Sequence, residues 1–134
     1  MATWRDLVTY IRQTYDILRA EPDEIRILMR YGVDADEEER SQMVVIAREV
    51  VDGHDWVQIA TPFARVDEVK LPAVLTEIGN TTVVGGAVVM GEYLVYRHSF
   101  PLINLDINEF VDPLELVAGS AELLEMRFIG RDEY

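Results

Sequence analysis

Three segments with the period of a β-strand follow one another between residues 23 and 62, separated only by short connections. In the first, the odd positions from Ile25 to Tyr31 are apolar and arginines occupy two of the positions between them, which is typical of a half-buried strand. The second is the β-branched segment 41–51, and the third spans 56–62. Strands joined so closely pair with their neighbours, so this region predicts a three-stranded antiparallel meander.

Two helices are predicted on either side of this meander. Thr3 and Asp6 have the spacing of a capping box, and apolar residues then recur at helical spacing to about Arg19. A second, short helix begins at Pro72, because proline fits the first helical turn, and stops at residues 79–80, where glycine and asparagine end the pattern.

The last third of the chain predicts two further strands and a long helix. The strands span roughly 81–90 and 92–99 and are rich in valine. The helix has a clear start signal, in which Asp112 caps, Pro113 takes the first helical position and Glu115 completes the capping box.

The predicted order of elements is α-β-β-β-α-β-β-α, and it indicates the fold class. Strands occur in runs and do not alternate strictly with helices, which favours an α+β fold. We therefore expect an antiparallel five-stranded sheet flanked by helices, forming one domain over residues 1–134.

Charge and cysteine content narrow the possible functions and partners. The net charge is −13, with 25 acidic and 12 basic residues, and such a field repels nucleic acid and anionic membrane surfaces. The chain has no cysteine, which excludes disulfides, zinc fingers and thiol nucleophiles. The start of the chain has no signal-peptide pattern, so a cytoplasmic protein is expected.

Catalytic, metal-binding and cofactor-binding motifs are weak in this sequence. The two histidines, His54 and His98, lie in a turn and at a strand end, without a nucleophile and base arranged around them. The acidic segment 34–39 lacks the glycine and distant glutamate of a calcium loop. We therefore expect no catalytic residues, no metal and no cofactor, and not an enzyme.

What remains is the surface of the sheet. Helices on one face leave the other face available for a partner, although the same apolar strand residues could instead be ordinary core. The candidate partner-binding residues are Val83, Val88, Leu94 and Tyr96, with Arg97 as an anchor for a carboxylate of the partner.

Several short segments resemble one bacterial protein family. They are the aromatic-led segment from Trp4 to Tyr15, Thr61 and Pro62 after Trp56, the segment from Leu75 to Asn80, the residues Gly86, Arg97, Phe100, Pro101 and Leu102, and the helix residues Ala121, Glu122 and Leu124. Together they are similar to the type III secretion chaperone-like fold, in its YbjN-type branch of putative sensory transduction regulators. The resemblance implies a helix-flanked antiparallel sheet, often dimeric, that holds extended segments of client proteins.

The main functional hypothesis is a non-enzymatic chaperone-like or regulatory adaptor that binds a segment of a client protein. One alternative is a small ligand-binding domain or enzyme with a pocket near His98, formed with Ser99 and nearby carboxylates between the sheet and the last helix. Another is a structural homodimer that uses up its sheet face and leaves no free binding face.

Overall fold

The computed structural model describes residues 3–31 and 40–130 of the chain. Its three α-helices, one 3-10 helix and six strands are, in chain order, α1 (Trp4–Thr14), β1 (Asp16–Glu21), β2 (Glu24–Tyr31), β3 (Arg40–Val51), β4 (His54–Arg65), η1 (Val66–Glu68), α2 (Leu71–Thr81), β5 (Gly86–Met90), β6 (Tyr93–Pro101) and α3 (Ile107–Phe128). The acidic segment 34–39 lies outside the described residues.

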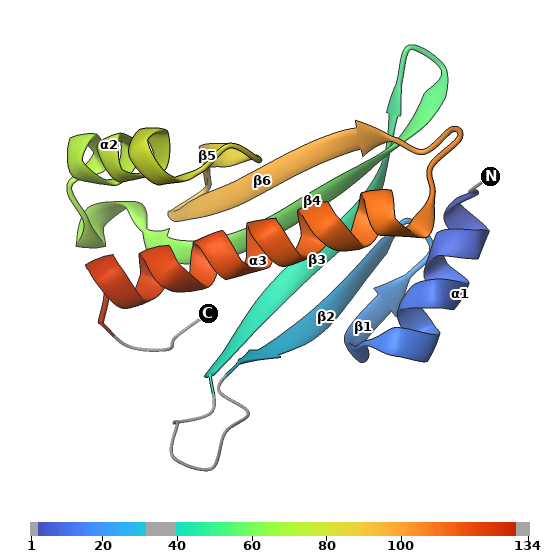
Figure 1. Ribbon diagram of the computed structural model, residues 1–134, viewed down its shortest axis with the longest axis horizontal. Coiled ribbons are helices and arrows are strands. Elements are labelled where there is room, and N and C mark those ends of the chain that lie inside the picture. The colour runs from blue at the N-terminus through green and yellow to red at the C-terminus, as the bar shows by residue number, and fades with distance from the viewer. Residues whose placement is uncertain (1–2, 32–39, 131–134) are drawn as a thin grey trace.

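The strands form one antiparallel sheet with the order β1-β2-β3-β4-β6-β5. The long helix α3 crosses one face of this sheet and contacts β3, β4 and β6 (Figure 1). The helix α1 lies beside β1 and β2, and α2 lies at the other end of the sheet near β5 (Figure 1). The α+β class and the helix-flanked antiparallel sheet are confirmed.

The predicted count of five strands is wrong, because the first helix ends at Thr14 and the chain turns into β1. Tyr15 has extended backbone angles, and β1 then pairs with β2 through a turn at residues 22–23. The indole N–H of Trp4 donates to the Pro22 carbonyl at 2.8 Å and ties α1 to this turn. Leu18, which fits the apolar stripe of a longer first helix, is 55% exposed.

The start predicted for the last helix is also wrong, because α3 begins six residues earlier. Asp106 is its N-cap, and the Glu109 carboxylate accepts from the Asp106 backbone N–H at 3.1 Å. Pro113 therefore lies inside the helix, where its missing N–H leaves one helical hydrogen bond unmade. The sequence contains two Asp-x-x-Glu boxes in succession, and the earlier one is used.

Other boundaries move by a few residues. The predicted strands 41–51 and 56–62 leave residues 52–55 for a turn, but the turn between β3 and β4 contains only Asp52 and Gly53, with φ of 50° and 77°. His54 already belongs to β4, which continues past Pro62 to Arg65. The helix α2 continues past the predicted stop to Thr81, so the next strand begins only at Gly86.

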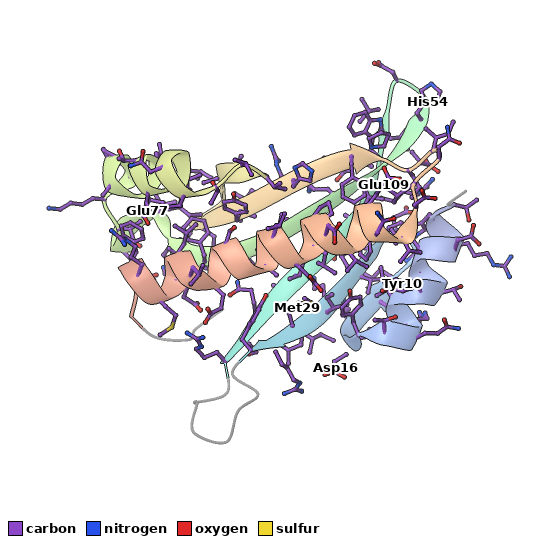
Figure 2. The ribbon with its side chains drawn as sticks, in the orientation of Figure 1. Tyr10, Asp16, Met29, His54, Glu77 and Glu109 are labelled. Carbon is purple, nitrogen blue, oxygen red and sulfur yellow. The ribbon has the colours of Figure 1, made fainter. Side chains whose placement is uncertain are left out.

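The core lies between the helices and one face of the sheet. The inward residues of the central strands, such as Ile27, Ile46 and Ile59, have no exposed surface. From the helix layer, α3 contributes Phe110 and Leu114, which are also fully buried. Figure 2 shows Tyr10 where α1 approaches α3, and its ring packs edge-on against Phe110 at 6.3 Å.

No helix within residues 3–31 and 40–130 combines the length and the apolar character needed to cross a lipid bilayer.

Candidate functional site

The two faces of the sheet differ in what covers them. Along β3, Val44 and Ile46 point toward the helices and have no exposed surface. Val45 and Ala47 point away from the helices and stay partly exposed, because successive strand residues face opposite sides. We call the side without helices the open face.

A trough runs along the open face and has a volume of about 820 Å³. Its lining comes from five strands, β2 to β6, and consists of Glu24, Arg26, Met43, Val45, Ala47, Glu49, Gln58, Ala60, Pro62, Met90, Tyr93 and Val95. Sequence reasoning named none of these residues as a contact. Alternation places Val44 and Val45 on opposite faces, but it does not tell which of the two faces the helices cover.

The shape of the trough follows from side-chain size. Its floor on β3 and β4 carries Val45, Ala47 and Ala60, which rise little above the backbone. Larger side chains stand on both sides, with Arg26 on β2 and Tyr93 on β6. Because β2 and β6 are three strand spacings apart, the trough is about 14 Å wide between backbones.

One row across the sheet shows how charge is placed on this face. Strand pairing aligns Arg26, Val45, Ala60 and Arg97 from β2 to β6, so two arginines flank two small apolar residues. The Arg26 guanidinium is held by Glu24 at 3.2 Å. Arg97 is exposed, and the contacts within the described residues include no ion pair for it.

The wall at the β6 end is fixed by its own contacts. Tyr93 lies under the Arg65 guanidinium, 5.5 Å from the ring centroid. Arg65 in turn donates to Glu92 at 2.8 Å, and this carboxylate is the main cause of the raised pKa of Arg65. The guanidinium therefore stays charged and holds the aromatic ring in place.

The structure separates the five predicted contact residues into three groups. Val88 and Arg97 lie on the open face, where Val88 pairs with Val95 and Arg97 with Ala60. Val83 is 99% exposed but precedes β5 and lies outside the trough. Leu94 and Tyr96 point to the helices and are 2% and 0% exposed, so a partner cannot reach them in this state.

Tyr96 has a structural role instead. Its hydroxyl donates to the Val84 carbonyl at 2.6 Å, which holds the segment between α2 and β5 against β6. Gly85 has a φ of +82°, and a Cβ there would meet Tyr96 Cε1 at 2.7 Å and the Arg97 carbonyl oxygen at 2.9 Å. Only glycine fits this close approach.

The residues of the alternative site near His98 are not brought together. His98 and Ser99 are successive residues of β6, so the His98 side chain lies on the helix side and Ser99 on the open face. His98 packs against Phe100, with ring centroids 5.9 Å apart. His54 lies at the tip of the β3–β4 hairpin (Figure 2) and is not among the residues that line the trough.

Polar residues under the second half of α3 form a buried network that the sequence did not reveal. Gln42 donates to Thr61 Oγ1 at 2.7 Å and to the Pro62 carbonyl at 2.6 Å, and Thr61 donates to the Met43 carbonyl at 2.7 Å. Nearby, Arg40 pairs with the buried Glu122 at 3.3 Å. This network is enclosed by the fold, so we assign it to packing between the sheet and α3.

The phenol of Tyr31 is also partly buried. Desolvation, followed by the charges of Glu122 and Glu115, raises the pKa of Tyr31 to about 12. The neutral phenol is therefore the form present at ordinary pH.

A smaller hollow of about 290 Å³ lies between α2 and α3. Two of the hydroxyls that line it are already used, since Thr81 and Thr82 each donate to a carbonyl of α2 at 2.7 Å. Its arginine, Arg127, pairs with Glu77 at 3.3 Å.

In the described part of the chain, no three histidine, aspartate or glutamate side chains gather as a metal site would require.

Comparison with known proteins adds no family: no protein-family model matches the chain, and no curated protein sequence matches it.

Proposed function

We propose that this chain is a non-enzymatic, chaperone-like or regulatory adaptor whose open face binds a segment of a partner protein. The single observation that carries the proposal is the trough, an apolar floor on β3 and β4 that no helix in the described part of the chain covers. Exposed apolar surface of this kind is unfavourable in water, and it is typical of interaction sites in folded proteins.

The organisation of the trough supports a binding role. Its floor is apolar while charged residues lie at its margins, as in protein interfaces with an apolar centre and a polar rim. Its wall is preorganised, because Arg65 and Glu24 hold the side chains beside it. A preorganised wall loses little conformational entropy when a partner binds.

The chemistry of the trough indicates the kind of segment it fits. A width of about 14 Å takes one segment, since a helix with its side chains is about 10–12 Å across and an extended strand is narrower. The apolar side of the segment would lie on Val45 and Ala60, and an acidic group at its edge would reach Arg97. The resemblance to the secretion chaperone-like family agrees with such a client.

Selection from a library of random peptides tests this proposal directly. The full chain is the target, and the affinity of each enriched peptide is then measured for the wild-type chain and for the Val45→Asp variant. We expect enrichment of peptides with clustered apolar residues and at least one acidic residue, and a loss of affinity of about tenfold or more for Val45→Asp.

Two variants control the experiment. Val50→Asp changes the same residue type on the same strand at a position that is 63% exposed and outside the trough, so affinity should not change. Arg97→Glu should weaken the acidic peptides by about tenfold. Absence of any enriched peptide, or equal binding to Val45→Asp, would contradict the proposal.

The homodimer alternative gives a different pattern. If the open face were covered by a second copy, the wild-type chain would be a dimer that selects no peptide, and Val45→Asp would be a monomer. Sedimentation of the wild-type chain and of this variant separates the two possibilities.

A further inference from the structure

The outward surface of α3 differs from that of an ordinary surface helix. On α1 the exposed positions are polar, for example Arg5, Thr9 and Arg12. On α3, Leu116 is 50% exposed and Leu123, which borders the hollow between α2 and α3, is 68% exposed. A helix that keeps large apolar residues on its outer side has the pattern of a helix that packs on two sides.

These leucines belong to one continuous stripe along the helix. Successive residues of an α-helix are separated by about 100° of rotation, so positions three or four apart return to nearly the same direction. Residues spaced four, three, one, three and four apart therefore lie within a sector about 100° wide. The residues of the stripe are Asp112, Leu116, Gly119, Ser120, Leu123 and Arg127. All six are at least partly exposed in the chain.

The stripe is symmetric about its centre. A two-fold axis passing between Gly119 and Ser120 and perpendicular to α3 would place a second α3 antiparallel to the first. Leu116 would then face Leu123 of the other copy, and Gly119 would face Ser120. The two central residues have small side chains, which lets helices approach closely, and the leucines lie about 10 Å apart along the axis on either side.

The ends of the stripe are complementary in charge under the same symmetry. Asp112 would lie opposite Arg127 of the other copy, and the reverse pair forms at the other end. Arg127 is 63% exposed at its side chain and contacts Glu77 at 3.3 Å. A guanidinium has five N–H donors, so it can keep Glu77 and accept a second carboxylate.

From this self-complementary stripe we infer that α3 of one copy pairs antiparallel with α3 of a second copy, giving a two-fold symmetric dimer. Such an interface is isologous, with the same residues on both sides. One helix pair buries an area at the low end of specific interfaces, so the dimer should form with a dissociation constant on the order of micromolar.

This arrangement has a consequence for the open face. The helices and the open face lie on opposite sides of the sheet, so pairing through α3 leaves the trough of each copy free (Figure 1). The dimer would present two troughs facing away from each other. A partner with two suitable segments would then gain avidity from the second contact.

Sedimentation over a range of protein concentrations tests the dimer. We expect reversible association of the wild-type chain, and loss of it in Leu116→Glu/Leu123→Glu. The matched control is Leu18→Glu/Val50→Glu, which adds the same charge at two exposed apolar positions outside the stripe and should associate as the wild type does. Circular dichroism of each variant verifies that it is folded.

Charge exchange gives a test that a general loss of solubility would not imitate. Asp112→Arg places like charges together and should weaken association by about tenfold. Adding Arg127→Asp restores opposite charges and should recover most of the affinity.

A single introduced thiol locates the axis, because the chain has no cysteine. Ser120→Cys should give a dimer with a short bifunctional maleimide, whereas the exposed Thr9→Cys on α1 should not.

A wild-type chain that is monomeric at all concentrations would overturn the inference. So would an α3 double variant that still dimerises, or equal cross-linking at Thr9→Cys. Dimerisation lost in Val45→Asp but kept in the α3 variant would assign the interface to the open face, so failure of this inference and failure of the peptide-binding proposal are distinguishable.

Discussion

The two faces of the sheet are made of similar residues but have different surroundings. On β3, Val44 is fully buried beneath the helices, while its neighbour Val45 lies in the open trough. On β4, Ile59 is likewise buried under the helices, whereas Ala60 lies on the trough floor and is itself only 7% exposed. An apolar strand residue of this sheet is therefore part of the core where a helix covers it, and part of the trough floor where none of the described helices does.

Polar groups differ between the faces in the same way. On the covered face, Gln42 and Thr61 are buried and joined by a hydrogen bond of 2.7 Å. On the open face, charged residues such as Glu24 and Arg97 lie at the margin of an apolar floor. The covered face is therefore closed, and the Gln42 amide N–H and the Thr61 hydroxyl are paired within it, although the buried Gln42 Oε1 has no hydrogen-bond partner among the described residues. The open face, in contrast, keeps partly exposed apolar surface and an exposed cation, Arg97.

The largest expected effect is seen when a charge is introduced at two neighbouring valines of β3, one on each face of the sheet. Val44→Asp places an unpaired charge in the core and should lower the free energy of unfolding by more than about 4 kcal/mol. Val45→Asp leaves its carboxylate in contact with water and should cost less than about 1 kcal/mol. Urea unfolding of both variants measures this difference, and equal losses would show that the open face is covered after all.

The next effect concerns the glycine that approaches Tyr96. Gly85→Ala combines a positive φ with contacts closer than 3 Å, so it should destabilise the fold by about 2–3 kcal/mol. Gly86→Ala is the control, because a Cβ there meets nothing within 4 Å, and its effect should stay within about 0.5 kcal/mol. Thermal unfolding compares the two, and a similar loss in both variants would argue against a specific contact at Tyr96.

A smaller effect is expected in the buried polar network. Thr61→Val removes the group that accepts from Gln42 and donates to the Met43 carbonyl, so it should cost about 1–3 kcal/mol. On the open face, Gln58→Leu should change stability by no more than about 0.5 kcal/mol. If Gln58→Leu were the more harmful of the two in denaturant titrations, the assignment of the network to packing would be wrong.

The smallest effect is a pH dependence at the margin of the covered face. The carboxylate of Asp6 accepts from the Thr3 backbone N–H at 3.1 Å, and this contact is the main reason that its pKa lies below the ordinary 3.8. A lowered pKa in the folded state stabilises the fold at pH values above 3.8, and this stabilisation is lost as the pH falls through the folded value.

Asp6→Asn should therefore lower the melting temperature slightly at neutral pH, and the gap to the wild type should close in acid. A gap that stayed constant from neutral pH to below pH 3.8 would show that the Asp6 charge contributes nothing to α1.

Much of the sheet could be predicted because strand alternation is a strong local signal. The strands β2 to β4 and the turn at Asp52 were visible for this reason. The strand β1 was missed, because apolar residues near Leu18 fit helical spacing as well as strand spacing. The sequence also contains two capping boxes before the core of α3, and neither periodicity nor capping rules decide between them.

The contact residues were harder to predict than the strands. Alternation divides Leu94 and Tyr96 from Val95 and Arg97, but it does not say which set the helices cover. That choice depends on where α3 lies across the sheet, which is a property of tertiary packing. Two of the predicted contact residues, Leu94 and Tyr96, belong to the set that the helices cover, and the structure buries both of them.

Methyl NMR of the full chain with labelled valine and leucine tests the central claim most directly. An enriched peptide is added to the protein, and the signals of the two faces are compared on the same strands. The account predicts that Val45, Val88 and Val95 shift, while Val44, Val57 and Leu94 do not. Shifts confined to the covered face, or to residues around α2 and α3, would contradict a binding site on the open face.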